Sequence, residues 1–224
     1  MEQLSKASTG TEHVLEIPAG AVNLEGNLCI PNGATGIVMF VHGSGSSRHS
    51  PRNKFVAEIL NASGLGTLLF DLLTPKEESI DSYTGQLRFN IDLLADRVVE
   101  VSRWLSHISY TSELKLGYFG ASTGAAAALL AASRMPDAIR AVVSRGGRPD
   151  LAGTALKQVL APTLLIVGAN DPVVLDLNRE AYALLPPKTE KALAIVPHAS
   201  HLFEEPKTLE TAASLASNWF CKYL

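Results

Sequence analysis

The sequence predicts an α/β protein in which an N-terminal antiparallel hairpin precedes a mostly parallel central sheet with helices on both faces. After residue 36, short apolar runs rich in β-branched residues alternate with longer helix-like segments. Parallel strands need such crossovers, whereas antiparallel hairpins cannot absorb them. The run Gly36–Val41 is apolar throughout, as in a strand that is covered on both faces. We expect a single domain over residues 1–224, because this length fits one domain of ordinary size.

The elements follow from their patterns in chain order. The hairpin is expected at 14–17 and 21–30, on either side of the turn signal Pro18-Ala19-Gly20. A proline at position 51 opens a helix that we expect to end at residue 62. The polar segment 74–84 is expected to be an exposed loop. The remaining strands are expected at 65–72, 114–119, 141–143, 163–167 and 192–196, and the remaining helices at 87–108, 122–133, 179–184 and 209–223.

Composition argues against several classes of function. The 19 Lys+Arg and 22 Asp+Glu give a net charge of −3, which does not indicate a nucleic-acid-binding surface. No apolar run approaches the ~18 residues of a membrane span, and the first ten residues lack the apolar centre of a secretory signal. Two cysteines, Cys29 and Cys221, favour free buried thiols over a disulfide framework. We therefore expect a cytoplasmic protein that binds neither nucleic acid nor membrane.

The strongest chemical signal is the pentapeptide Gly-Ala-Ser-Thr-Gly at 120–124, which fits the pattern G-x-S-x-G. It lies between an expected strand and an Ala-rich helix. A sharp strand-to-helix turn needs small residues beside the serine, because the two backbones crowd there. Such a turn would expose the Ser122 hydroxyl above the sheet as a nucleophile. The alternative interpretation is a Gly/Ser turn in which Ser122 only caps the helix.

A serine nucleophile needs a base, and the base needs a carboxylate that orients it. His201 lies in the loop after the last expected strand and is favoured over His198, because the loop needs length to reach back over the serine. Asp171 lies in the turn after the strand 163–167 and is favoured over Asp176. An isolated Asx turn is the alternative for Asp171. The resulting order, Ser122, Asp171 and His201, is that of the α/β-hydrolase fold.

An oxyanion hole and a substrate pocket complete the expected site. One N–H should come from Thr123, which follows the nucleophile, and another from Ser44, with Gly45 as second choice. The loop after Gly36–Val41 lacks the pattern of a phosphate-binding P-loop. Metal ligation is not expected, because the histidine and glutamate residues between 198 and 205 match no compact zinc pattern. Substrate contacts are expected from Gly45, Arg48, His49 and Arg145.

Arg145 has two interpretations that the sequence leaves open. At the carboxyl end of the strand 141–143, its guanidinium could hold a substrate carboxylate. It could equally tie loops together by pairing with Asp150 or Glu204.

Taken together, these motifs resemble the α/β-hydrolase superfamily and, within it, its dienelactone-hydrolase-like branch. The resemblance runs from Gly36 to the last helix. It implies a Ser122–His201–Asp171 triad that acts on esters or lactones without a cofactor. Dienelactone hydrolases proper use a cysteine nucleophile, so Ser122 favours a general carboxylesterase. The long loop motif is also similar to hydrolase domains found beside phosphoribosyltransferase-like domains. The motifs concerned are VHGSGSSRHSPRN (41–53), GASTG (120–124), GAND (168–171) and HLFEEP (201–206).

The expected function is therefore a serine hydrolase that cleaves small carboxylic esters or lactones through an acyl-enzyme on Ser122. Its partner would be a small-molecule ester. Only a short connection separates the strands that end near Ser144 and begin near Thr163, so no lid domain is expected. Two alternatives remain: an acyltransferase, perhydrolase or amide/thioester hydrolase on the same triad, or a binding protein with a vestigial hydrolase pocket. The sequence leaves the oligomeric state open.

Overall fold

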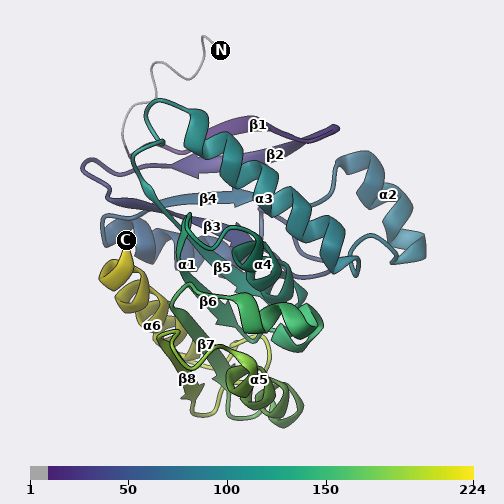
Figure 1. Ribbon diagram of the computed structural model, residues 1–224, viewed down its shortest axis with the longest axis vertical. Helices are drawn as coiled ribbons and strands as arrows, with labels where there is room; N and C mark the ends of the chain where they lie inside the picture. The colour runs from purple at the N-terminus through teal and green to yellow at the C-terminus, as the bar shows by residue number, and fades with distance from the viewer. Residues whose placement is uncertain (1–9) are drawn as a thin grey trace.

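The computed structural model describes residues 10–224, which form one eight-stranded sheet flanked by helices (Figure 1). The strands lie side by side in the order β1-β2-β4-β3-β5-β6-β7-β8. Their bounds are β1 His13–Ala19, β2 Val22–Cys29, β3 Gly36–Val41, β4 Gly66–Phe70, β5 Lys115–Ala121, β6 Ile139–Arg145, β7 Thr163–Gly168 and β8 Lys191–Val196.

The sheet has an antiparallel edge and a parallel centre. β1 pairs with β2, and β2 pairs with β4, in the antiparallel sense. All pairings from β4 to β8 are parallel. The expected hairpin and the mostly parallel sheet are both confirmed. The carboxyl ends of these six parallel strands (β4, β3, β5, β6, β7 and β8) consequently lie in a row, and their loops meet at one edge.

Helices cover both faces of this sheet. Figure 1 shows α3, α4 and α5 on the near face, while α1 and α6 pack on the far face. The helix bounds are α1 Pro51–Ala62, α2 Pro75–Thr84, α3 Ile91–His107, α4 Thr123–Arg134, α5 Pro172–Leu184 and α6 Thr208–Tyr223. The helix predicted from Pro51 has the expected bounds, and α5 is longer than the segment 179–184 that its pattern had indicated.

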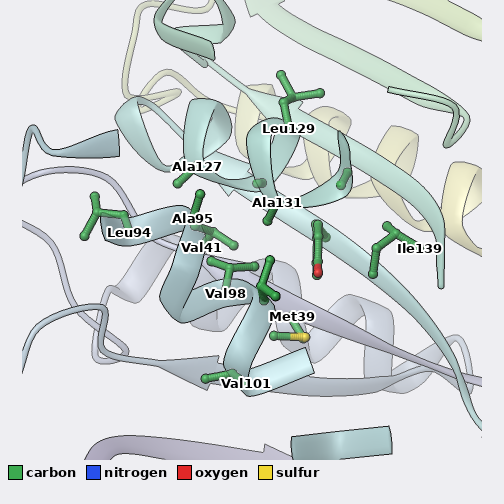
Figure 2. Close-up of a cluster of buried hydrophobic side chains, with 14 of the residues drawn as sticks. Met39, Val41, Leu94, Ala95, Val98, Val101, Ala127, Leu129, Ala131 and Ile139 are labelled. Atoms are coloured by element: carbon green, nitrogen blue, oxygen red, sulfur yellow. The ribbon is translucent and has the colours of Figure 1, made fainter. Parts of the chain in front are cut away.

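The central strand β3 supplies side chains to both layers, as its unbroken apolar pattern predicts. Met39 and Val41 point toward α3 and α4, and Val38 and Phe40 point toward α1 and α6. Figure 2 shows the first layer, in which small residues of α4 such as Ala127 face the valines and alanines of α3. Small side chains let these helices approach the sheet closely, which places the start of α4 directly above β3 and β5.

The prediction of an exposed loop at 74–84 is wrong, because α2 occupies Pro75–Thr84. Thr74 caps this helix: its side chain accepts from the Glu77 N–H, and the Glu77 carboxylate accepts from the Thr74 N–H. Gly85 ends the helix in the left-handed conformation. This reciprocal cap and the proline at the first position stabilise a helix with a weak apolar face. Arg97 of α3 binds Glu77 and fixes α2 to the body of the protein.

The connection between β6 and β7 contains only a short 3₁₀ segment, η1 Pro149–Gln158, which kinks at Gly153. This segment packs on α4 and α5. The expectation of an uninterrupted core without a lid domain at this point is confirmed. Among residues 10–224, no helix is long and apolar enough to cross a membrane. Cys29 and Cys221 are free thiols, but the expectation that they are buried is wrong, since Cys221 is exposed.

The Glu77 carboxylate should make the stability of the protein depend on acid pH. Burial tends to raise the pKa of Glu77, but hydrogen bonds from Arg97 and Thr74 outweigh it and lower the pKa to about 2. A carboxyl whose folded pKa is depressed stabilises the fold above its ordinary pKa of 4.5 and loses that contribution as the pH falls toward 2. Glu77→Gln should therefore lower the free energy of unfolding near neutral pH by about 1 kcal/mol, a figure limited by solvent screening of this partly exposed pair.

Urea unfolding near neutral pH and at about pH 3 tests this expectation. The difference between wild type and Glu77→Gln should be smaller at the lower pH. Glu58→Gln, on the exposed face of α1, is the control and should change little at either pH. An equal loss of stability at both pH values would contradict the assigned role of the Glu77 charge.

Candidate active site

A cavity of about 770 Å³ opens at the carboxyl edge of the parallel strands. Segments that are far apart in the sequence form its wall: the loop after β3, the first turn of α1, the start of α2, the ends of β5 and β6 and the loop after β8. Ser122 and His201 both line it. A cavity of this size at this edge is the usual ligand site of an open α/β sheet.

Ser122 occupies a strained turn between β5 and α4. Its φ of 50° and ψ of −125° lie in a region that L-residues seldom adopt. Neighbouring backbone holds it there, because the Ser122 N–H donates to the Arg145 carbonyl (3.4 Å) and the Ser122 carbonyl accepts from the Arg148 N–H (2.9 Å). The turn is crowded: a Cβ on Gly124 would lie 2.1 Å from the Val41 carbonyl oxygen. The strand–turn–helix context expected of G-x-S-x-G is therefore present.

His201 and Asp171 form a hydrogen-bonded pair on two adjacent loops. His201 Nδ1 lies 2.7 Å from Asp171 Oδ2. The Asp171 side chain is 15% exposed, whereas that of His201 is 38% exposed and faces the cavity. A carboxylate on Nδ1 holds the proton there and leaves Nε2 as the basic nitrogen.

The loops that carry this pair are tied together by backbone contacts. The Ala169 N–H donates to Val196, and the Asn170 N–H and side-chain amide donate to the carbonyls of Ala199 and His198, all at 2.9 Å. The turn that carries His201 is held by a further bond, in which the Ser200 N–H donates to a Glu205 carboxylate oxygen at 3.0 Å. The distance between Asp171 and His201 is thus set by main-chain geometry.

The alternatives for the pair lie elsewhere. His198 is exposed and does not line the cavity; its backbone carbonyl serves as an acceptor in the loop. Asp176 is on α5, where it pairs with Arg179 at 2.9 Å and both side chains are exposed. The structure therefore places Ser122 and His201 on one cavity and bonds Asp171 to His201, whereas His198 and Asp176 take no part in this arrangement.

The loop after β3 is anchored by a buried histidine. His42 Nε2 accepts from the Leu72 N–H (3.0 Å), so the proton resides on Nδ1, which lies 2.9 Å from the Gly43 carbonyl. Burial lowers the pKa of His42. His42 is therefore neutral, and both of its ring nitrogens are hydrogen-bonded within the protein, so it holds the loop in place.

The expected oxyanion donor Ser44 already has a partner. Its N–H donates to the Thr123 hydroxyl at 2.8 Å. This bond joins the loop after β3 to the first residue of α4, so it holds Ser44 beside Thr123, the residue expected to supply the other donor. It also means that the Ser44 N–H can reach an oxyanion only by sharing or releasing the Thr123 oxygen.

Three of the four expected substrate contacts, Gly45, His49 and Arg145, line the cavity. Arg48 does not, and the expectation for it is wrong. Its guanidinium binds Asp71 and Glu25 and donates to Asn27, so it ties the loop to β2 and to the end of β4. All three nitrogens of the Arg48 guanidinium are thus engaged by side chains of the protein, which makes Arg48 a tie between these segments and not a contact of the cavity.

Arg52 and Asn53 also line the cavity, and the sequence reasoning missed them. They occupy the first turn of α1, after the loop expected to supply the oxyanion hole. The sequence did contain a signal for them: a helix that begins with a proline soon after a strand places its first turn at the carboxyl edge of the sheet. Among the described residues, no group of three or more His, Cys, Asp or Glu side chains is placed to hold a metal ion.

No family model matches the chain. A solved structure does: a dienelactone hydrolase from Anabaena variabilis ATCC 29413 is 58% identical, with a TM-score of 0.94. The match covers 97% of this chain and 100% of that one. The chain belongs to the dienelactone hydrolase family. Membership of this family supports a hydrolase, as do the strained turn at Ser122 and the hydrogen-bonded pair of His201 and Asp171.

Solved structures of lower sequence identity share the fold of the present chain. Est1E from Butyrivibrio proteoclasticus is 15% identical with a TM-score of 0.77, and the match covers 93% of this chain and 98% of that one. The Pyrococcus furiosus esterase Pf2001 is 21% identical with a TM-score of 0.74, covering 95% and 93% of the two chains. At these identities the likeness establishes the α/β-hydrolase fold alone.

Curated relatives carry a different name. Two Mycobacterium tuberculosis proteins, from strains CDC 1551 / Oshkosh and ATCC 25618 / H37Rv, are each 55% identical over 210 residues. Both are named, provisionally, as phosphoribosyl transferases. The match covers 94% of this chain but 46% of each relative, so this family member spans about half the length of the curated proteins that it matches.

The crowding of the turn between β5 and α4 predicts that one added methyl group at Gly124 will destabilise the protein. Gly124→Ala would place its Cβ against the carbonyls of Val41 and His42, which are backbone atoms that cannot rotate away. We expect a loss of about 3 kcal/mol in the free energy of unfolding, measured by urea denaturation. Ser133→Ala at the far end of α4 is the control and should change it by less than about 0.5 kcal/mol. A Gly124→Ala protein as stable as the control would show that the turn is looser than described.

Proposed function

We propose that this chain is a serine hydrolase that cleaves small carboxylic esters or lactones through an acyl-enzyme on Ser122. One observation carries the proposal: Ser122, in its strained turn, shares a cavity with His201, and His201 is held through Nδ1 by Asp171 at 2.7 Å. The same residues are the triad that the sequence predicts, and the chain order is that of the fold.

In the first half-reaction, His201 Nε2 takes the Ser122 hydroxyl proton as the oxygen attacks the acyl carbonyl. The carbonyl π electrons move to oxygen and form a tetrahedral oxyanion. Asp171 stabilises the imidazolium without accepting its proton. The intermediate collapses, the acyl–oxygen bond breaks, and His201 returns the proton to the leaving alcohol. In a lactone the alcohol remains attached to the acyl group.

In the second half-reaction, His201 takes a proton from water, whose oxygen attacks the acyl-enzyme. Breaking the bond to Ser122 releases the acid, and the proton returns to the serine. This scheme uses no cofactor. An acyl acceptor other than water would give acyl transfer on the same groups.

The oxyanion donors in this proposal are the backbone N–H groups of Thr123 and Ser44. Thr123 begins α4, so its N–H is among the helix-terminal donors that have no intrahelical partner. The Ser44 N–H would turn from the Thr123 hydroxyl to the oxyanion, or bridge both. A stronger acceptor should win this competition, because hydrogen bonds to ions are roughly twice as strong as neutral ones.

Hydrolysis suits this cavity better than phosphoribosyl transfer. The cavity is built around a serine, a histidine and an aspartate, and the curated relatives that carry the transferase name have as much chain again beyond the matched part. We attribute the hydrolase chemistry to the matched part and propose that the transferase name refers to the rest of those proteins.

Ser122→Ala should remove ester hydrolysis and leave the fold intact. With p-nitrophenyl acetate as substrate, we expect kcat/KM to fall at least about 1000-fold, because the nucleophile is lost while oxyanion and binding contacts remain. Circular dichroism checks the fold, and Ser133→Ala is the matched control. Wild-type protein, but not the variant, should react covalently with a fluorophosphonate. Retained hydrolysis in Ser122→Ala would rule out this serine as the nucleophile.

The choice between the two histidines can be tested separately. His201→Gln should lower kcat by about 1000-fold or more, because the serine loses its base. His198→Asn should retain activity, since the exposed His198 backbone has a φ of 64° that asparagine tolerates. Steady-state kinetics on p-nitrophenyl acetate measures both variants. The opposite pattern would move the base to His198.

A further inference from the structure

Asn178 is a buried polar residue of α5 that takes no part in the reaction proposed above. It is fully buried, with an exposed fraction of 0%, and it does not line the cavity. Among residues 10–224, its side-chain oxygen Oδ1 has no hydrogen-bond partner. A buried acceptor without a partner lowers stability, so an asparagine at this position calls for an explanation.

The amide nitrogen of Asn178 faces two carbonyl oxygens. Its Nδ2 donates to the Gly147 carbonyl at 2.9 Å and to the Val174 carbonyl at 2.8 Å. These two bonds use both amide hydrogens and fix the orientation of the side chain, because only its nitrogen can donate. The bond to Val174 stays within α5, whereas the bond to Gly147 reaches the loop after β6. Asn178 therefore joins this helix to that loop.

The peptide unit between Gly147 and Arg148, here called the bridging peptide, connects Asn178 to the nucleophile. Its carbonyl accepts from Asn178 Nδ2. Its N–H, which is that of Arg148, donates to the Ser122 carbonyl at 2.9 Å. The C=O and N–H of a trans peptide point in opposite directions, so one planar unit lies between the two residues. A donor on its carbonyl also polarises its N–H and strengthens the bond to Ser122.

Close packing surrounds the bridging peptide. A Cβ on Gly147 would lie 2.0 Å from Ser144 Oγ and 2.6 Å from Ala125 Cβ, so the backbone touches both the end of β6 and α4. A Cβ on the preceding residue, Gly146, would lie 3.0 Å from the His201 carbonyl oxygen. The loop after β6 is thus in contact with the segments that carry the nucleophile and the base. A displacement of this loop would disturb both of them.

The helix that carries Asn178 also carries the carboxylate that binds the base. Asp171 occupies the N-cap position of α5, but its side chain does not cap the helix and instead binds His201. Asn178 lies about two turns further along the same helix. One rigid element therefore holds the base through Asp171 and reaches the backbone of Ser122 through Asn178.

We propose that Asn178 is a positioning residue for Ser122. Its bond to the bridging peptide helps to hold the Ser122 backbone at its φ of 50° and at a fixed place relative to the base that Asp171 orients. The catalytic meaning of this inference rests on the proposed hydrolase function, whereas the chain of contacts does not. Strained conformations persist only where their surroundings over-determine them, and this bond is one such constraint. The Oδ1 atom without a partner is the cost of placing an amide N–H₂ group at this point.

Asn178→Leu tests this role, because leucine has the same branched shape and no donor. Stopped-flow measurements with p-nitrophenyl acetate give the acylation rate constant and the dissociation constant of the substrate separately. We expect the acylation rate constant to fall roughly 10- to 100-fold, the effect of displacing a reacting group by about 1 Å. The dissociation constant should change by less than about 3-fold, since Asn178 does not line the cavity. Labelling of Ser122 by a fluorophosphonate should slow by a similar factor.

Hydrogen exchange followed by mass spectrometry gives a readout that does not depend on activity. In Asn178→Leu, the backbone amides of residues 146–150 should exchange at least about tenfold faster than in wild type, because the bridging peptide loses its anchor. Thr111→Val is the matched control. It removes a buried hydroxyl that donates to the Leu105 carbonyl at 2.5 Å, at the end of β5 opposite Ser122. It should lower the melting temperature as well, but leave acylation and the exchange of this segment unchanged.

A folded Asn178→Leu protein with the wild-type acylation rate would overturn the positioning role. So would slower acylation with unchanged exchange at 146–150, or an equal slowing in Thr111→Val, because the effect would then not pass through the bridging peptide. If Asn178→Leu does not fold, Asn178→Ala removes the same donor without added bulk and decides by the same measurements. A wild type without ester hydrolysis or labelling would instead overturn the proposed function, and faster exchange in the variant would still establish the tie between Asn178 and the loop that binds Ser122.

Discussion

The close approach of the start of α4 to the end of β3 is the constraint on which the rest of the site depends. Gly124 has no room for a side chain against the carbonyls of Val41 and His42, and this contact forces Ser122 into its positive φ. From that point the Ser122 backbone reaches the end of β6, and the Thr123 hydroxyl reaches the loop after β3. One steric contact therefore fixes three strand ends around the hydroxyl.

A second group of main-chain contacts sets the base. The loops after β7 and β8 share backbone hydrogen bonds, and Gly168 lets the Ala199 carbonyl approach to within 2.2 Å of where a Cβ would lie. The Asp171–His201 distance is thereby fixed before any substrate arrives. Such preorganisation is what general-base catalysis by a serine–histidine pair requires, because a displaced imidazole cannot take the proton.

The sequence was enough to predict the parallel sheet and to select Ser122, Asp171 and His201 as the candidate triad, because unbroken apolar strands and G-x-S-x-G are local signals. It failed where partners come from distant elements. Arg48 looked like a pocket residue, but the topology places Glu25 of β2 and Asp71 beside it. Segment 74–84 was expected to be a loop because it is polar. Thr74 and Glu77 nevertheless have the spacing of a helix-capping pair, and they cap α2 in the structure. Arg145 stayed ambiguous, since only the structure shows that Asp150 and Glu204 are engaged elsewhere.

The unpartnered acceptor of Asn178 and the strained turn at Ser122 both cost stability, as expected of residues kept for function. The central claim is that Ser122 carries the acyl group during turnover. Rapid-quench mass spectrometry of the protein with p-nitrophenyl acetate tests it most directly. The account predicts a transient acetyl adduct on the peptide that contains Ser122. Hydrolysis that proceeds with no adduct on this peptide, or with an adduct on another residue, would contradict it.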